Sequence, residues 1–112
     1  MVCGDRKWSN YNLIKNVLKK FDNKSIMIHG GCSGADKISG DIGIKLGLKV
    51  IVFPAQWKKH GKRAGSLRNT QMLDKGRPDL VLAFHSDIEH SKGTKNMISQ
   101  AKERNIQVIL YK

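Results

Sequence analysis

Residues 29–36 form a loop of a kind that could bind phosphate. The loop reads HGGCSGAD and lies between the apolar residues 26–28 and a segment with helical periodicity. At such a position glycines let backbone amides approach an anion, and the dipole of the following helix favours negative charge. We therefore expect four small residues to hold a phosphate: Gly30, Gly31, Ser33 and Gly34. A tight turn without a ligand is the alternative, because the glycine spacing matches neither the GxGxxG fingerprint nor a P-loop.

Three other side chains of this loop carry functional groups. Asp36, in the first turn of the helix, either interacts with the helix dipole or binds a ribose hydroxyl. Cys32 is a conceivable nucleophile at a helix N-terminus. His29 alone does not complete a catalytic dyad with it, and most free cysteines are packed and inert. We therefore expect no catalytic role for the cysteine.

Two short segments offer further groups to an anion. Arg6 stands near a glycine after a short first strand and could make a bidentate contact to phosphate or carboxylate, or lie exposed on the surface. Lys92, Gly93 and Thr94 begin a helix, where the amides and the hydroxyl could clamp a second phosphate. Helix capping alone would also explain Thr94.

The most basic segment is residues 57–69. It contains five Lys or Arg, one His and Trp57 within 13 residues. Cations beside an aromatic ring suit a stacked base with its phosphate, in a nucleotide or in single-stranded nucleic acid. The alternative is a mobile charged loop with Trp57 packed in the core.

The elements that would position these segments follow from the apolar pattern. A helix is expected from Tyr11 to Phe21, with Ser9 or Asn10 as its N-cap. Its apolar residues recur at helical spacing, at positions 11, 14, 17, 18 and 21. Continuous apolar runs that alternate with helices indicate a doubly wound parallel sheet covered on both faces. Buried strands are expected at 26–28 and 50–53, further strands at 80–84 and 107–110, and a strand stub at 1–3. Further helices are expected at 35–46, 66–74 and from 93 onward.

Ligands of open parallel sheets bind at the carboxyl ends of the strands. The loops expected at that edge are 4–9, 29–36, 54–65 and 85–93, and they hold nearly every unusual residue of the chain. This placement favours one site built from all four loops.

Length and composition limit the remaining possibilities. The chain of 112 residues fits one domain, 1–112, and its net charge of +12 favours anionic partners. It lacks an apolar run long enough for a membrane span and an export signal, so we expect no membrane partner and a cytoplasmic location. Cys3 and Cys32 are expected as free thiols, and no Cys or His spacing suggests a metal site.

Several motifs together resemble the YspA-like branch of the SLOG superfamily, which includes the DprA DNA-processing proteins and the LOG phosphoribohydrolases. The resemblance runs over nearly the whole chain and is most specific in HGKRAGSLRNTQM. The motifs are GDRKW at 4–8, GGCSGAD at 30–36, FPAQWKKHGKRAGSLRNTQM at 53–72, PDLVLAF at 78–84 and KGTKNM at 92–97.

The resemblance implies a Rossmann-like, three-layer α/β/α fold with a parallel five-stranded sheet in the order 3-2-1-4-5. It also implies binding of nucleotides or nucleotide-derived ligands such as ADP-ribose, without a separate cofactor. Because members of the superfamily often pair, a homodimer would fit as well. The ligand-binding positions it implies are Gly4, Arg6, Gly30, Gly31, Ser33, Gly34, Asp36, Arg68, Asn69, Gly93 and Thr94.

One departure from the superfamily bears on catalysis. LOG-type hydrolases carry a PGGxGTxxE motif whose Glu serves catalysis, whereas here Met97 stands at the position of that Glu and the glycine pair is absent. We therefore expect a binding module that senses or sequesters its ligand. The alternatives are a nucleotide N-glycosidase with Asp36 as its candidate acid or base, and a DprA-like binder of single-stranded nucleic acid.

Overall fold

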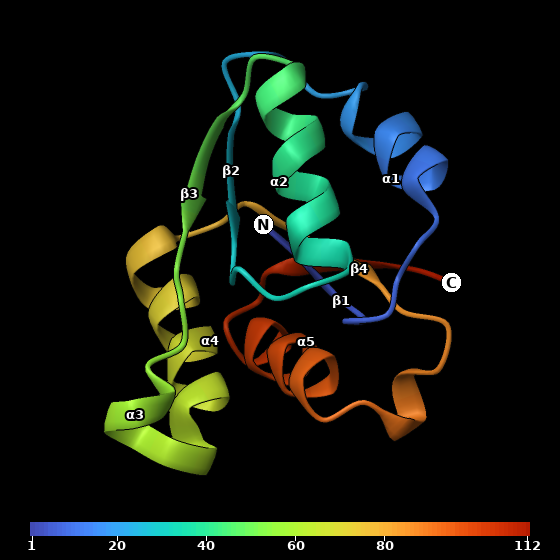
Figure 1. The fold of residues 1–112 in the computed structure, drawn as a ribbon. Coiled ribbons are helices and arrows are strands. Elements are labelled where there is room, and N and C mark those ends of the chain that lie inside the picture. Colours follow the sequence, from blue (N-terminus) through green and yellow to red (C-terminus); the bar gives the residue numbers. More distant parts are fainter.

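The computed structural model describes residues 1–112, with parallel strands enclosed by two pairs of helices (Figure 1). The strands form two sheets. In the first, β4 (Leu80–Phe84) lies between β1 (Val2–Gly4) and β5 (Gln107–Tyr111). In the second, β2 (Ile26–His29) pairs with β3 (Lys49–Val52). All of these pairings are parallel, as the alternation of strands and helices predicted.

The prediction of one five-stranded sheet is wrong. The neighbours within each sheet agree with the predicted order, but β1 and β2 are not paired by hydrogen bonds. β1 has only three residues, and its flanking groups bond β4: the Met1 carbonyl accepts from Leu82 N at 2.8 Å, and Asp5 N donates to Phe84 O at 2.9 Å. So short a strand offers few groups for a second ladder.

The side chains of the strands bury both faces of the fold. Along β4, Leu82 and Phe84 point into one apolar cluster, whereas Val81 and Ala83 point into another. This period of two is the geometry of a strand covered on both sides. β1 and β2 contribute to both clusters in the same way, so a shared core joins the two sheets.

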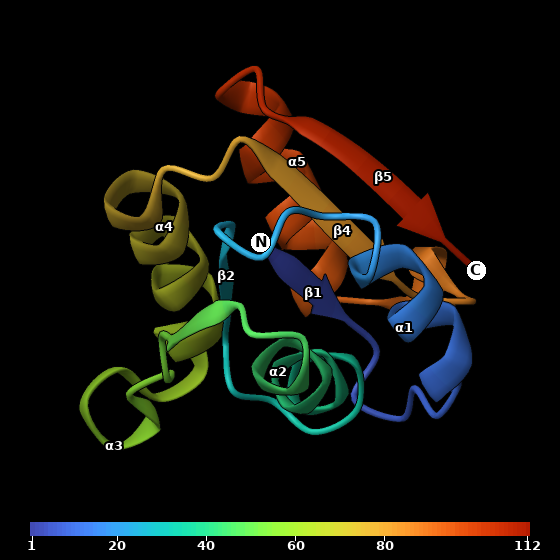
Figure 2. The same cartoon turned by 90° about the horizontal axis from the view of Figure 1, so that it is seen from above.

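Two helices cover each face (Figure 2). The first cluster is closed by α1 (Tyr11–Leu18) and α2 (Ala35–Lys45), and the second by α4 (Ala64–Gly76) and α5 (Gly93–Glu103). The Asn10 side chain accepts a hydrogen bond from Leu13 N at 3.1 Å and caps α1, as predicted. No helix combines the length and apolar character that crossing a membrane requires.

Three local predictions were wrong. α1 ends at Leu18, so Phe21 lies outside it and is exposed. β3 was expected to be buried, but it is the open edge of its sheet, and Ile51 and Val52 are exposed because nothing pairs with its outer side. The stretch expected as an irregular basic loop contains the short helix α3 (Trp57–His60) and a 3-10 turn at Gly61–Arg63.

Candidate functional site

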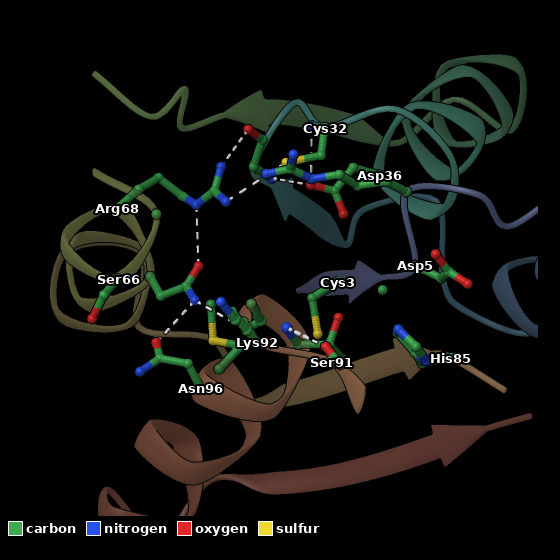
Figure 3. Close-up of a pocket in the computed structure, with 18 of the residues that line it drawn as sticks. Cys3, Asp5, Cys32, Asp36, Ser66, Arg68, His85, Ser91, Lys92 and Asn96 are labelled. Carbon is green, nitrogen blue, oxygen red and sulfur yellow. Dashed lines mark hydrogen bonds between the residues drawn. The ribbon is translucent and has the colours of Figure 1, made fainter. Parts of the chain in front are cut away.

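A cavity of about 640 Å³ opens at the carboxyl ends of β1, β2 and β4, where the predicted loops meet α4 and α5 (Figure 3). This volume falls within the roughly 300–1,000 Å³ of small-molecule sites. Most of its lining residues are polar or charged, since only 5 of the 22 are hydrophobic. All four loops expected at this edge contribute to it. Ten predicted site residues line the cavity: Gly4, Arg6, Gly30, Asp36, Trp57, Arg68, Asn69, Lys92, Gly93 and Thr94.

Three predicted site residues, Gly31, Ser33 and Gly34, do not line the cavity. Ser33 Oγ donates to Arg6 O at 3.3 Å and so ties the second loop to the first. Gly34 has φ of 73°, and a Cβ there would overlap the backbone oxygens of Asp5 and Arg6. The glycine is therefore required by the close approach of two loops, which gives a structural reason for its presence.

Asp36 stabilises the loop between β2 and α2. Its Oδ2 accepts hydrogen bonds from Gly30 N at 3.0 Å and Cys32 N at 3.2 Å. Gly31 N donates to His29 Nδ1 at 3.0 Å. The amides of Gly30 and Gly31 are thus already bonded within the loop, and a carboxylate accepts from the loop where an anion would be held. Ser33 and Gly34, the other two residues expected to hold a phosphate, lie outside the cavity lining.

Asp36 is 5% exposed, and its burial raises the pKa of the carboxyl from 3.8 to about 6. The two loop amides, Arg68 and Arg6 lower the pKa by smaller amounts. A carboxyl group with a raised pKa in a cavity is typical of a functional position.

Arg68 connects three segments at the wall of the cavity. Its Nη1 donates to Gly30 O at 2.6 Å, and its Nη2 lies 3.7 Å from Cys32 Sγ. A Cβ on Gly30 would occupy the space of the guanidinium, so the glycine at this position makes room for the arginine. Figure 3 shows Arg68 reaching from α4 toward Cys32.

Asn69 joins α4 to α5. Its Oδ1 accepts from Arg68 Nε at 3.1 Å, while its Nδ2 donates to Gly93 O at 3.3 Å and Asn96 Oδ1 at 3.1 Å. The first turn of α5 is capped by Ser91, whose Oγ accepts from Thr94 N at 3.1 Å. These bonds fix the position of the cavity wall next to Lys92.

Arg6 and Trp57 meet at the cavity, although they come from different loops. The Arg6 guanidinium carbon lies 5.9 Å from the centroid of the Trp57 ring, which is a cation–π distance. Trp57 is 49% exposed, so the alternative of a core tryptophan is wrong. Its ring is accessible to a planar ligand.

Positive charge dominates the cavity. Its lining cations form no ion pair with a carboxylate, because the salt bridges of the protein lie elsewhere, at His90–Asp87, Lys95–Glu89 and Arg104–Asp74. Asp5 and Asp36 are the acids of the wall. The five lining cations are Arg6, Lys7, Lys62, Arg68 and Lys92.

Sequence reasoning missed several lining residues. Cys3 lies within the short strand β1, and His85 directly follows β4, so their place near the sheet edge could have been read from the strand pattern. Asn96 lies one helical turn after Gly93 and could have been found by that spacing. Cys32, which was set aside, also lines the cavity.

His29 does not belong to the cavity. It is buried, its Nε2 is packed against Gly40, and burial lowers the pKa of its imidazole. Cys3 and Cys32 are free thiols. No three His, Cys, Asp or Glu side chains are grouped so that they could hold a metal ion.

Comparisons with known proteins found a matching family model and a relative. Residues 1–60 match the model of the YspA, cpYpsA-related SLOG family. The Gene 61 protein of Mycobacterium phage D29 is 31% identical over 118 residues, an alignment that covers 97% of this chain and 92% of that protein. No solved structure matches the chain.

Proposed function

Because this chain belongs to the YspA, cpYpsA-related SLOG family, which supports a nucleotide-related function, we propose that its cavity binds a phosphorylated, nucleotide-derived ligand. The observation that carries the proposal is that five cations line the cavity without carboxylate partners. An anion that enters this cavity gains charge-assisted hydrogen bonds, which are about twice as strong as neutral ones.

The phosphate is expected next to Lys92 and the first turn of α5. The loop after β2 is a poorer place, because Asp36 accepts from the amides of Gly30 and Cys32 and an ionised carboxylate repels phosphate. Trp57 supplies an exposed ring on which a base can stack, with Arg6 above that ring. In this arrangement one cavity binds the whole ligand, as a sensor or a sequestering module would.

Isothermal titration with AMP, ADP-ribose and inorganic pyrophosphate tests the proposal. We expect binding by the wild type, weakened about tenfold by Lys92→Met, since one charged hydrogen bond contributes about 1.5–3 kcal/mol. Lys20→Met, on the exposed segment after α1, is the matched control and should leave the affinity unchanged. Folded protein that binds none of the three probes would overturn the proposal.

An N-glycosidase is a second candidate, favoured by the Asp36 carboxyl with its pKa of about 6 in the cavity. Incubation with AMP and chromatography of the products would reveal free adenine and ribose 5-phosphate. Turnover that survives in Asp36→Asn would exclude this residue as the acid or base.

Single-stranded nucleic acid is a third candidate, favoured by the net charge of +12 and by the exposed lysines of α3 beside the cavity. Its affinity for an oligonucleotide would fall steeply with salt, with a slope set by the number of neutralised phosphates. A mononucleotide in the cavity gives a shallower slope. Titrations at several salt concentrations separate the two.

A further inference from the structure

One oxygen of the buried carboxyl group of Asp36 has no donor within the protein. Oδ2 accepts from the amides of Gly30 and Cys32, but Oδ1 accepts from none of the protein's donors. The residue nevertheless lines the cavity, and Figure 3 shows its carboxyl group on the wall above Cys3. Ser39 Oγ is the one fully buried side-chain oxygen or nitrogen without a partner, so Asp36 Oδ1 is accessible from the cavity. An accessible acceptor without a protein donor at a cavity wall offers a position for a donor on the ligand.

The neighbouring side chains do not fill this role. The guanidinium of Arg68 is directed to Gly30 O, Phe53 O, Asn69 and Cys32. Arg6 stacks on Trp57. The Cys3 thiol keeps its proton, because burial raises its pKa to about 12, and a thiol is a weak donor.

The chemistry of the acceptor selects the group that meets it. A phosphate that carries its full charge has no proton to donate and is repelled by a carboxylate. A hydroxyl group is neutral and donates well, and in a nucleotide the sugar hydroxyls lie between the base and the phosphate. The cavity offers matching groups, with an aromatic ring at Trp57, a bare acceptor at Asp36 and a cation at Lys92.

We propose that Asp36 Oδ1 accepts a hydrogen bond from a ribose hydroxyl, so that the cavity selects ribosyl phosphates over phosphates that lack the sugar hydroxyls. The proposal rests on the proposed function and specifies the class of ligand. The sugar then lies against the start of α2, and the phosphate lies toward Lys92, directly before α5. Asp36, which holds the loop after β2, thus contacts the sugar, although the glycines of this loop predicted a phosphate-binding loop.

The test compares AMP with 2′,3′-dideoxy-AMP, which has the same base and phosphate but lacks both hydroxyls. Wild-type protein should bind AMP more tightly by about tenfold or more, the usual effect of a hydrogen bond to a charged group. Asp36→Asn should lose most of this preference. The asparagine carbonyl can take the two loop amides, so a neutral NH₂ group then meets the hydroxyl and the hydrogen bond to a charged acceptor is lost.

Asp41→Asn is the matched control, because it removes one carboxylate from an exposed position of the same helix. It should keep the preference for AMP. Inorganic pyrophosphate should respond differently to Asp36→Asn, because it has no sugar hydroxyl to lose. The variant removes a negative charge from the cavity and should bind pyrophosphate at least as tightly as the wild type does.

Several results would overturn the inference. If the wild type binds AMP and the dideoxy analogue equally, no ribose hydroxyl bonds to Asp36, and the inference fails while the proposed function stands. If Asp36→Asn weakens both nucleotides equally and keeps the preference, the carboxylate only supports the loop. If Asp36→Asn does not fold, the wild-type comparison of the two nucleotides still decides. If the wild type binds neither nucleotide nor pyrophosphate, the proposed function fails and the inference fails with it.

Discussion

At the scale of single residues, Asp36 reverses the expected role of its loop. The glycines suggested that bare amides wait for a phosphate, yet Gly30 N and Cys32 N donate to this carboxylate. Sequence reasoning placed Asp36 at the site but could not show which of its oxygens is occupied. That information depends on the path of the loop backbone, which the pattern of residue types does not specify.

Asp36 should also make the stability of the protein depend on pH. The carboxyl pKa is about 6 in the folded protein, against 3.8 when exposed, so between these values the folded state holds a proton that the unfolded state has lost. Stability therefore falls as the pH rises from about 4 to 6, by about 3 kcal/mol for a shift of this size.

Urea unfolding of the wild type and of Asp36→Asn at pH 4, 5, 6 and 7 measures this contribution. The difference between the two proteins isolates Asp36, because the other titrating groups are shared. We expect the wild type to lose stability relative to the variant as the pH rises. A difference that stays constant over this range would contradict the assignment.

The two cysteines should react at different rates. Cys3 is buried and the pKa of its thiol is raised to about 12, whereas Cys32 is partly exposed at the cavity wall. Iodoacetamide should therefore modify Cys32 first, because the thiolate is the reactive form and must be reached. Peptide mass spectrometry after timed labelling measures both rates, and bound AMP should slow the reaction at Cys32. Faster labelling of Cys3 would contradict the placement of β1.

At the scale of elements, Gly34 shows how α2 is joined to the first loop. Its φ of 73° is rare for residues with a side chain, and a Cβ would overlap the backbone of Asp5 and Arg6. Gly34→Ala should cost about 2–4 kcal/mol from strain and overpacking together.

Gly93→Ala is the matched control for this substitution, since nothing lies within 4 Å of the added Cβ at the start of α5. It should keep or slightly raise stability, because alanine favours the helix. Thermal unfolding followed by circular dichroism compares the two variants. Equal melting temperatures would show that the loops do not meet as described.

Most elements could be predicted from the sequence. The spacing of apolar residues gave the helices and the strands because burial on one or two faces determines that spacing. α3 was missed because its four residues are too few for a periodic pattern. The exposure of β3 was missed because an apolar run is the same whether its strand is central or at an edge.

At the scale of the whole molecule, the strand order was predictable in part. Each sheet contains the expected neighbours, but the gap between β1 and β2 follows from a first strand of three residues, whose pairing the sequence pattern does not determine. The cavity was predictable as a place, since the carboxyl ends of parallel strands meet at one edge. The position of Asp36 on one wall of the cavity and of Lys92 on another could not be predicted. It depends on hydrogen bonds between segments that are distant in the sequence.

The central claim is that a phosphorylated, nucleotide-derived ligand binds in this cavity. A titration of ¹⁵N-labelled protein with AMP, followed by amide chemical shifts, tests it most directly. We predict that the shifts concentrate at residues 4–7, 30–36 and 91–97 and at Trp57, from four segments that meet at the cavity. Shifts confined to the exposed lysines of α3 or to the open edge at β3, or no shifts at millimolar AMP, would contradict the claim.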